Sequence, residues 1–327
     1  MKSESVNLKL PIYEASKRRQ WIIGLAVVSL FSVFVGYYIS IHREEFSVLW
    51  KSSFRVTVMA GFCLWIGFLL NSYQINLFLK KFDTRLRLFE LIFVTHGMML
   101  GNLVIPMRGG SGALALYLKR SKHLDYHKFA VIYGGTAILV AMVSATMGLF
   151  ALAYIACAFQ IYEGALSAAL FSILAGSAYL AFFLPVFKKK NPGRILGLLC
   201  RLNESWIALS HDSFLIARVA VSLALINLSQ TLALYFIYES IGKPLGLTST
   251  LVVSSLGAVA NLVPITPGSI GFFDAVIVET PRLLGLDTAS AVMAAVLFRI
   301  LSFMICLAFG LPGFYYFLKR PGIPNAS

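Results

Sequence analysis

Apolar runs separated by short polar segments fill most of the chain. Six of these runs are long enough to cross a hydrocarbon core of about 30 Å. They are residues 21–41, 54–79, 129–158, 164–187, 214–241 and 288–318. Two further apolar regions, 89–118 and 248–285, are each interrupted near the middle by glycine and proline. The pattern predicts an all-α polytopic membrane protein in which residues 1–327 form a single transmembrane domain.

The two interruptions have matching sequences. The first reads NLVIPMRGGSG from Asn102 to Gly112, and the second reads NLVPITPGSIG from Asn261 to Gly271. An offset of 159 residues aligns the Asn, Leu and Val that open each segment, together with two glycines in each. Hydrocarbon cannot pair the N–H and C=O groups of a broken helix. We therefore expect each break to be buried in protein or to line a hydrated cavity.

The apolar leg that follows each break is short. It is ten residues long from Gly109 to Leu118, and eleven residues long from Gly268 to Val278. At about 1.5 Å per residue, neither leg crosses the membrane as a helix. Each broken region is therefore either a re-entrant helical hairpin, or a first leg that spans alone.

The distribution of positive charge favours the hairpins. The chain is 58% hydrophobic and 13% charged, and its net charge is +14. If both broken regions are hairpins, twenty of the 28 Lys and Arg residues fall in the loops and termini on one side. If residues 89–106 spanned alone, the basic cluster at 119–122 would lie on the opposite side. The positive-inside rule therefore predicts six spanning helices and two re-entrant hairpins, with both termini cytoplasmic.

The same assignment predicts an inverted repeat. Repeat 1 covers residues 21–158, repeat 2 covers residues 164–318, and each consists of two spans, a hairpin and a third span. Because three crossings per repeat is an odd number, the halves have opposite orientations and their hairpins enter from opposite faces. Many transporters have this architecture, with the substrate site at broken helices near the midplane. Residues 193–210 add an amphipathic pattern typical of a helix on the membrane surface, or of a short helix packed on the protein.

The polar residues at the breaks suit an anion. A half-helix that begins at mid-depth directs free N–H groups and the positive end of its dipole into the site. An arginine within a span is costly and is usually functional or paired. Asp274 is either a counter-ion or a partner for an amine. We predict that the substrate-binding residues are Asn102, Arg108, Gly109, Gly110, Ser111, Gly112, Asn261, Thr266, Pro267, Gly268, Ser269, Gly271, Asp274 and Arg299.

Structural explanations of the same residues are also available. Glycine and proline occur in transmembrane helices for packing alone. Arg299 could be held by Asp274 or by Glu279, and Arg108 could extend its side chain to the membrane surface. His96 suits an interior hydrogen-bonded histidine as well as a proton relay.

Other classes of function have little support in the sequence. The positive charge lies in the loops of an apolar chain, so it does not indicate nucleic-acid binding. The four cysteines are scattered, and His123 and His127 lie in a basic loop where Asp125 is the sole acidic neighbour. We found no nucleophile–base set, P-loop or zinc motif. We therefore expect no enzymatic activity, no cofactor and no metal.

Three motifs resemble those of a known family. They are Pro106–Ser111 followed by Leu118–Arg120, then Pro267–Asp274, and then Leu297–Ile300. They are similar to signatures of the lysylphosphatidylglycerol synthase-type transmembrane, or flippase-like domain, family. That family usually has an acid where Ser111 stands, and Glu where Asp274 stands. Its larger members move aminoacylated phospholipids across the membrane and carry a soluble aminoacyl-transferase domain. We expect no such domain in this sequence, so the resemblance implies the translocation part alone here.

The sequence therefore predicts a flippase in the cell (inner) membrane. Its substrate would be a phospholipid or a lipid-linked cargo, whose headgroup crosses through a central polar cavity. Two alternatives stay open. One is a membrane enzyme that acts on a lipid phosphate through Asp274, His96 and Arg108. The other is a non-transporting subunit of an envelope-lipid synthesis complex. The cargo, energy coupling and oligomeric state also stay open.

Overall fold

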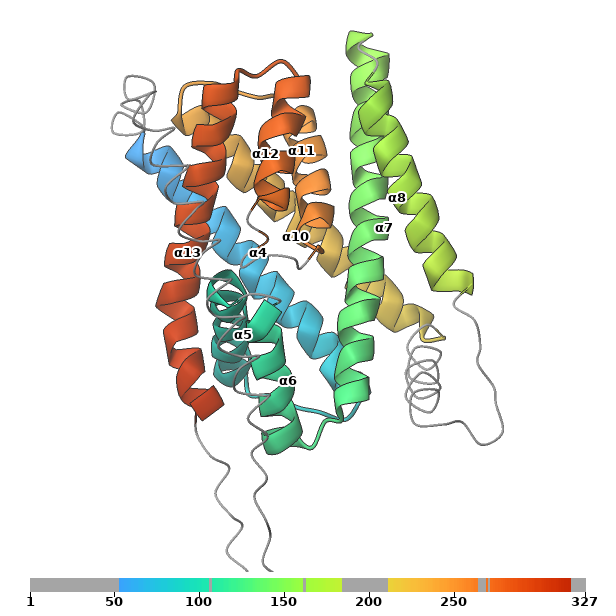
Figure 1. The fold of residues 1–327 in the computed structure, drawn as a ribbon, viewed down its shortest axis with the longest axis vertical. Helices are drawn as coiled ribbons and strands as arrows, with labels where there is room; N and C mark the ends of the chain where they lie inside the picture. Colours follow the sequence, from blue (N-terminus) through green and yellow to red (C-terminus); the bar gives the residue numbers. More distant parts are fainter. Residues whose placement is uncertain are drawn as a thin grey trace, which may run out of the picture.

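The computed structural model describes residues 53–105, 108–160, 163–183, 211–263, 269 and 271–318. Within these ranges the chain forms nine helices and no strands (Figure 1). The helices are α4 (Phe54–Lys81), α5 (Leu88–Val104), α6 (Gly109–Lys122), α7 (Tyr126–Phe159), α8 (Gly164–Phe183), α10 (Ser213–Ser240), α11 (Leu247–Ala260), α12 (Phe272–Leu283) and α13 (Thr288–Leu318). The predicted span 21–41 and the surface helix 193–210 lie outside the described residues.

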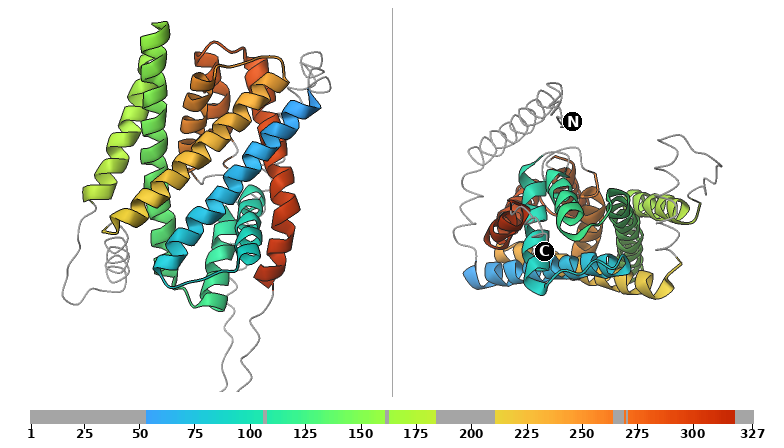
Figure 2. Two further views of the ribbon diagram at one scale, coloured as in Figure 1. Left: turned by 180° about the vertical axis from the view of Figure 1, so that it is seen from behind. Right: turned by 90° about the horizontal axis from the view of Figure 1, so that it is seen from below.

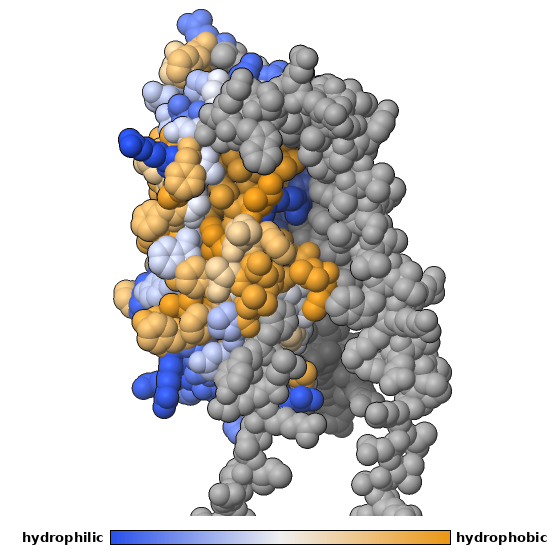
Figure 3. Space-filling view, turned by 90° about the vertical axis from the view of Figure 1, so that its left-hand side faces the viewer, coloured by the Kyte–Doolittle hydropathy of each residue, from blue (hydrophilic) through white to orange (hydrophobic). Residues whose placement is uncertain are grey.

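Four of these helices, α4, α7, α10 and α13, are long and apolar enough to cross a membrane. Helix α8 is also apolar, but the part of it whose side chains are described, Gly164–Tyr179, is shorter. A broad hydrophobic band covers the visible middle of the molecule, with hydrophilic residues above and below it (Figure 3). The prediction of an all-helical, multi-pass membrane protein is therefore confirmed.

Helices α4 and α10 pack along most of their length and run in opposite directions (Figure 2). Small residues bring the two backbones together. A Cβ on Gly67 would lie 3.3 Å from the Ser229 hydroxyl oxygen, and that hydroxyl donates a hydrogen bond to the Cys63 carbonyl. Close contact through small and hydroxylated residues is typical of helices packed within a membrane. The two helices therefore form a diagonal support for the rest of the fold.

Two pairs of shorter helices pack against this support. Helices α5 and α6 lie side by side near one end of the molecule, and α11 and α12 lie side by side near the other (Figure 1). Helix α13 packs against α5, and α7 packs against α11. Helix α8 packs on the outer side of α7, where a Cβ on Gly148 would lie 2.8 Å from a methyl carbon of Leu170.

The contact between α5 and α13 requires glycine. A Cβ on Gly313 would lie 2.0 Å from the Phe93 carbonyl oxygen, and one on Gly310 would lie 2.8 Å from the His96 carbonyl oxygen. Any side chain at either position would therefore push the two helices apart. This packing fixes the position of α5, which carries the first break at its C-terminal end.

Candidate functional site

The first break occupies the few residues between α5 and α6. Helix α5 ends at Val104, Ile105 is extended, and Arg108 adopts the left-handed conformation with φ 54° and ψ 47°. Gly110 lets the two helices touch, because a Cβ there would lie 2.0 Å from the Met98 carbonyl oxygen. The described part of the broken region therefore consists of two helices, α5 and α6, in close backbone contact.

A side-chain clasp closes the first break. The Asn102 amide oxygen accepts a hydrogen bond of 2.9 Å from the Ser111 backbone N–H, which is one of the free donors at the start of α6. The Ser111 hydroxyl donates to the Tyr133 hydroxyl oxygen over 2.6 Å. These contacts join α5, α6 and α7 at the level of the break.

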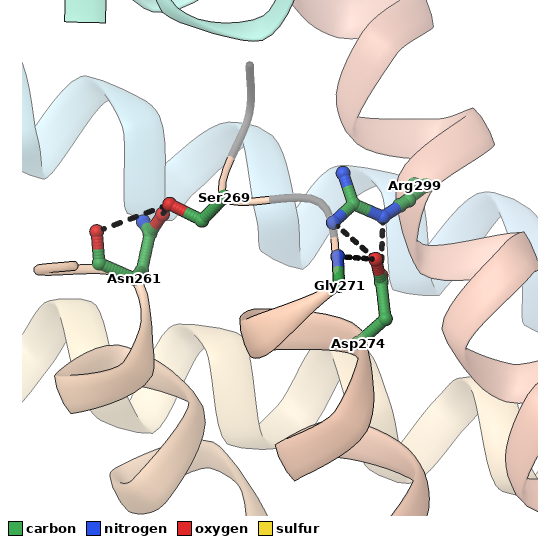
Figure 4. A network of polar contacts seen from close by, with 5 residues as sticks. All are labelled: Asn261, Ser269, Gly271, Asp274 and Arg299. Atoms are coloured by element: carbon green, nitrogen blue, oxygen red, sulfur yellow. Dashed lines mark hydrogen bonds and ion pairs between the residues drawn. The ribbon is translucent and has the colours of Figure 1, made fainter. Parts of the chain in front are cut away.

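A weaker version of the clasp occurs at the second break. The Ser269 hydroxyl lies 3.3 Å from the Asn261 amide oxygen (Figure 4). Ser269 and Gly271 both have positive φ, 53° and 93°. The predicted site residues Thr266, Pro267 and Gly268 lie outside the described residues.

The second break also carries an ion pair. The Arg299 Nε donates to Asp274 Oδ1, and its Nη2 donates to Asp274 Oδ2 over 2.8 Å (Figure 4). The Gly271 backbone N–H donates to the same carboxylate over 3.0 Å, so Asp274 also caps α12. The Arg299 and Asp274 side chains are 20% and 13% exposed. Of the two acids considered for Arg299, the partner is Asp274, since Glu279 pairs with Arg282.

Arg108 connects the two breaks. Its Nη2 donates to the Asn261 main-chain carbonyl, 153 residues further along the chain. Its Nη1 donates to the Tyr133 hydroxyl over 3.2 Å, and its guanidinium lies over the Tyr133 ring at 5.5 Å from the centroid. Asn102, Arg108, Ser111, Asn261 and Ser269 therefore belong to one cluster.

The charge of this cluster is positive. Arg299 is neutralised by Asp274, but no Asp or Glu within the described part of the chain pairs with Arg108. Its hydrogen-bond partners there are a carbonyl and a hydroxyl, neither of which carries a charge. The described residues at the breaks thus hold one uncompensated positive charge beside the start of α6, where the helix dipole adds to it.

Tyr133 is the site residue that the sequence analysis missed. It lies near the start of the apolar run 129–158, where aromatic residues are common, and its position is 25 residues after Arg108. The feature that could have identified Tyr133 from sequence is its hydroxyl, since a tyrosine in an apolar segment usually places that group on a polar partner.

The remaining predicted residues have different surroundings. A Cβ on Gly109 would lie 2.1 Å from a side-chain carbon of Ile105, whereas one on Gly112 would meet no atom within 4 Å. Gly109 is thus required for packing, and Gly112 faces open space. His96 is fully buried, its Nδ1 lies 2.7 Å from the Ile92 carbonyl, and its ring lies among Phe68 and Phe309. It takes no part in the cluster at the breaks.

The described residues do not bring three or more His, Cys, Asp or Glu side chains together as a metal site would require. A family model described as the lysylphosphatidylglycerol synthase TM region matches residues 21–310. No curated protein matches the chain. Because the family model covers most of its length, the chain belongs to the family of lysylphosphatidylglycerol synthase transmembrane regions.

Proposed function

We propose that the protein is a lipid flippase that moves the headgroup of a phospholipid or lipid-linked cargo between leaflets. The observation that carries the proposal is the uncompensated charge of Arg108, at the point where the two breaks meet. Arg108 is half-buried and has no acidic partner among the described residues, and a phosphate would supply both the missing charge and strong hydrogen bonds. The family name also points to a lipid-related substrate.

The start of α6 adds a second attraction for phosphate. Helix N-termini bind anions because their free N–H groups and dipole favour negative charge. Arg108 precedes that helix directly and adopts a conformation uncommon for a residue other than glycine. In the proposed mechanism a lipid phosphate displaces the Asn261 carbonyl from Arg108. The headgroup then crosses between the breaks while the acyl chains stay in the lipid.

From the spacing of the helices we infer an inverted repeat with two re-entrant hairpins, which would provide this path. Helices α4 and α10 begin and end 159 residues apart, and α5 and α11 also begin 159 residues apart. Exchanging the halves turns the contact of α5 with α13 into that of α11 with α7, and both contacts are present. The two short-helix pairs would then enter from opposite membrane faces, one from each half.

The charge distribution gives the proposed orientation. The loops and helix ends beside α5, α6 and the start of α7 hold most of the described Lys and Arg residues. We call this end of the molecule the basic end. By the positive-inside rule it faces the cytoplasm, with both chain termini on the same side of an inner membrane.

Reconstitution tests the proposal. Purified protein in liposomes should accelerate the exchange of headgroup-labelled lipids between leaflets over empty liposomes, with anionic and zwitterionic lipids tried separately. Arg108→Ala should slow exchange roughly tenfold or more, since a hydrogen bond to a charged group contributes about 1.5–3 kcal/mol. Arg120→Ala, which removes an exposed arginine from the other end of α6, is the control and should leave the rate unchanged.

Analysis of the lipids after the assay separates the alternatives. Unchanged lipids in a new leaflet support translocation. Covalently altered lipids would instead indicate an enzyme that acts on a lipid phosphate. No exchange with any lipid, combined with stable copurification of a lipid synthase, would indicate a non-transporting subunit.

A further inference from the structure

A separate pocket lies at the basic end, away from the breaks. It has a volume of about 470 Å³ and is lined by Asn76, Lys80, Arg85 and Leu86. The first two residues belong to the last turns of α4, and the other two to the loop that leads into α5. The volume lies within the range of small-molecule sites and exceeds what a single phosphate ion requires.

The pocket carries two positive charges and no acid among its lining residues. Lys80 and Arg85 are exposed and have no ion-pair partner within the described ranges. Three other lysines at this end do have one. Lys81 pairs with Asp212 at 2.6 Å, Lys122 with Glu90 at 2.9 Å, and Lys119 with Asp125. Lys80 and Arg85 are therefore available to an external anion.

Backbone hydrogen bonds shape the loop that carries Arg85 before any ligand binds. The Thr84 backbone N–H donates to the Leu79 carbonyl over 2.9 Å, and the Asp83 N–H donates to the Lys80 carbonyl over 3.1 Å. The Thr84 side chain is 5% exposed. These bonds fold the loop back on the end of α4, so the loop backbone needs little further ordering on binding.

The rest of the lining consists of an amide and an apolar side chain. Asn76 is one helical turn further into α4 than Lys80, about 6 Å along the axis. Its amide oxygen is buried and has no hydrogen-bond partner within the described chain. Leu86 is half-buried and packs against the hydrophobic core beside α4 and α5. The two cations offer charge for a phosphate, and Leu86 offers an apolar contact for the chains that accompany a phosphate in a phospholipid.

We propose that this pocket is a binding site for the phosphate of an anionic phospholipid at the membrane surface. Basic pockets beside transmembrane helices bind anionic headgroups through charge, and this attraction is strongest on the cytoplasmic leaflet. Lys80 and Arg85 hold the phosphate, and Asn76 and Leu86 line the rest of the pocket. The site is independent of the translocation path, because it shares no residue with the cluster at Arg108.

Lipid retention on purified protein tests the site. The protein is solubilised in a neutral detergent with phosphatidylglycerol and phosphatidylcholine, and retained lipid is measured by native mass spectrometry. The wild-type protein should retain phosphatidylglycerol in preference. Lys80→Gln with Arg85→Gln should weaken that retention roughly tenfold, given the strength of such charge contacts. Lys119→Gln with Arg120→Gln removes the same charge from the same end and should change retention less than about twofold.

Two further measurements decide between sources of the phosphate group. Inorganic phosphate at millimolar concentration should not displace the lipid, and Asn76→Leu should reduce lipid retention without changing the melting temperature. Equal losses in both double variants would overturn the proposal and leave general surface charge as the cause. Complete displacement by inorganic phosphate would overturn the lipid assignment and indicate a free-phosphate site. Because retention involves no leaflet exchange, neither result depends on flippase activity.

Discussion

At the scale of single residues, Arg108 is held at the junction of the breaks chiefly by Tyr133 and by the Asn261 carbonyl. Tyr133 contributes its hydroxyl to Arg108 and to Ser111, and its ring lies beneath the guanidinium. Tyr133→Phe keeps the ring and removes both hydrogen bonds. We expect a roughly tenfold slower lipid exchange, because hydrogen bonds to charged groups contribute about 1.5–3 kcal/mol. Tyr154→Phe, an exposed tyrosine on the same helix, is the control. Equal rates for both variants and the wild type would exclude a positioning role for Tyr133.

The ion pair of Arg299 and Asp274 gives a second test at this scale. Removing one partner leaves the other as a poorly solvated charge, at a cost of about 3–5 kcal/mol, whereas removing both avoids that cost. Asp274→Ala should therefore lower the melting temperature of the purified protein more than the double variant Asp274→Ala with Arg299→Ala. A double variant that melts at or below the temperature expected from adding the single effects would show that the residues act independently.

At the scale of helices, packing through glycine is the main constraint. Gly313→Ala should separate α5 from α13, because its Cβ would lie 2.0 Å from the Phe93 carbonyl oxygen. We expect a large loss of thermal stability in detergent and slower lipid exchange. Gly134→Ala on α7 meets no atom within 4 Å and is the control. It should melt at or above the wild-type temperature, since alanine favours helix by about 1 kcal/mol relative to glycine. Similar melting of the two variants would contradict the close contact.

The ends of α4 and α10 are joined by a pH-sensitive contact. Hydrogen bonds from Lys81 and from the Leu215 backbone N–H hold the pKa of the exposed Asp212 carboxyl below its usual value. A lowered pKa means that this contribution to stability is present above about pH 4 and is lost as the pH falls through the folded-state value. Asp212→Asn should therefore reduce the loss of stability on acidification below pH 4, measured by thermal melting. The change should be small, because the pair is exposed.

Most helix boundaries could be predicted from sequence, for a physical reason. A membrane requires long uncharged runs and closed backbone hydrogen bonding, so hydropathy and breakers mark the elements closely. The predicted span 54–79 corresponds to α4 (Phe54–Lys81), and the predicted span 129–158 corresponds to α7 (Tyr126–Phe159). The partner of Arg108 could not be predicted, because no local pattern links it to a carbonyl 153 residues away. The role of Tyr133 could not be predicted for the same reason.

At the scale of the whole molecule, the arrangement places two pairs of short helices against one diagonal support. Arg108 links the two pairs, because its side chain reaches from the start of α6 to the end of α11. Close approach of broken helices inside a hydrophobic protein is expected only where protein or water satisfies the free backbone groups. The contact between Arg108 and Asn261 is itself exposed, and the claim on which the proposed translocation path depends is that water reaches the junction of the breaks.

Labelling of single cysteines tests that claim most directly. In a variant without native cysteines, cysteine would replace Gly112 beside the first break or Gly176 on the outer face of α8, two positions where a Cβ meets no atom within 4 Å. The account predicts that a water-soluble thiol reagent modifies Gly112→Cys rapidly and Gly176→Cys slowly, because the reactive thiolate forms only where water is present. An anionic lipid should slow the first reaction. If Gly112→Cys reacts no faster than Gly176→Cys, the junction of the breaks is dry and the account is contradicted.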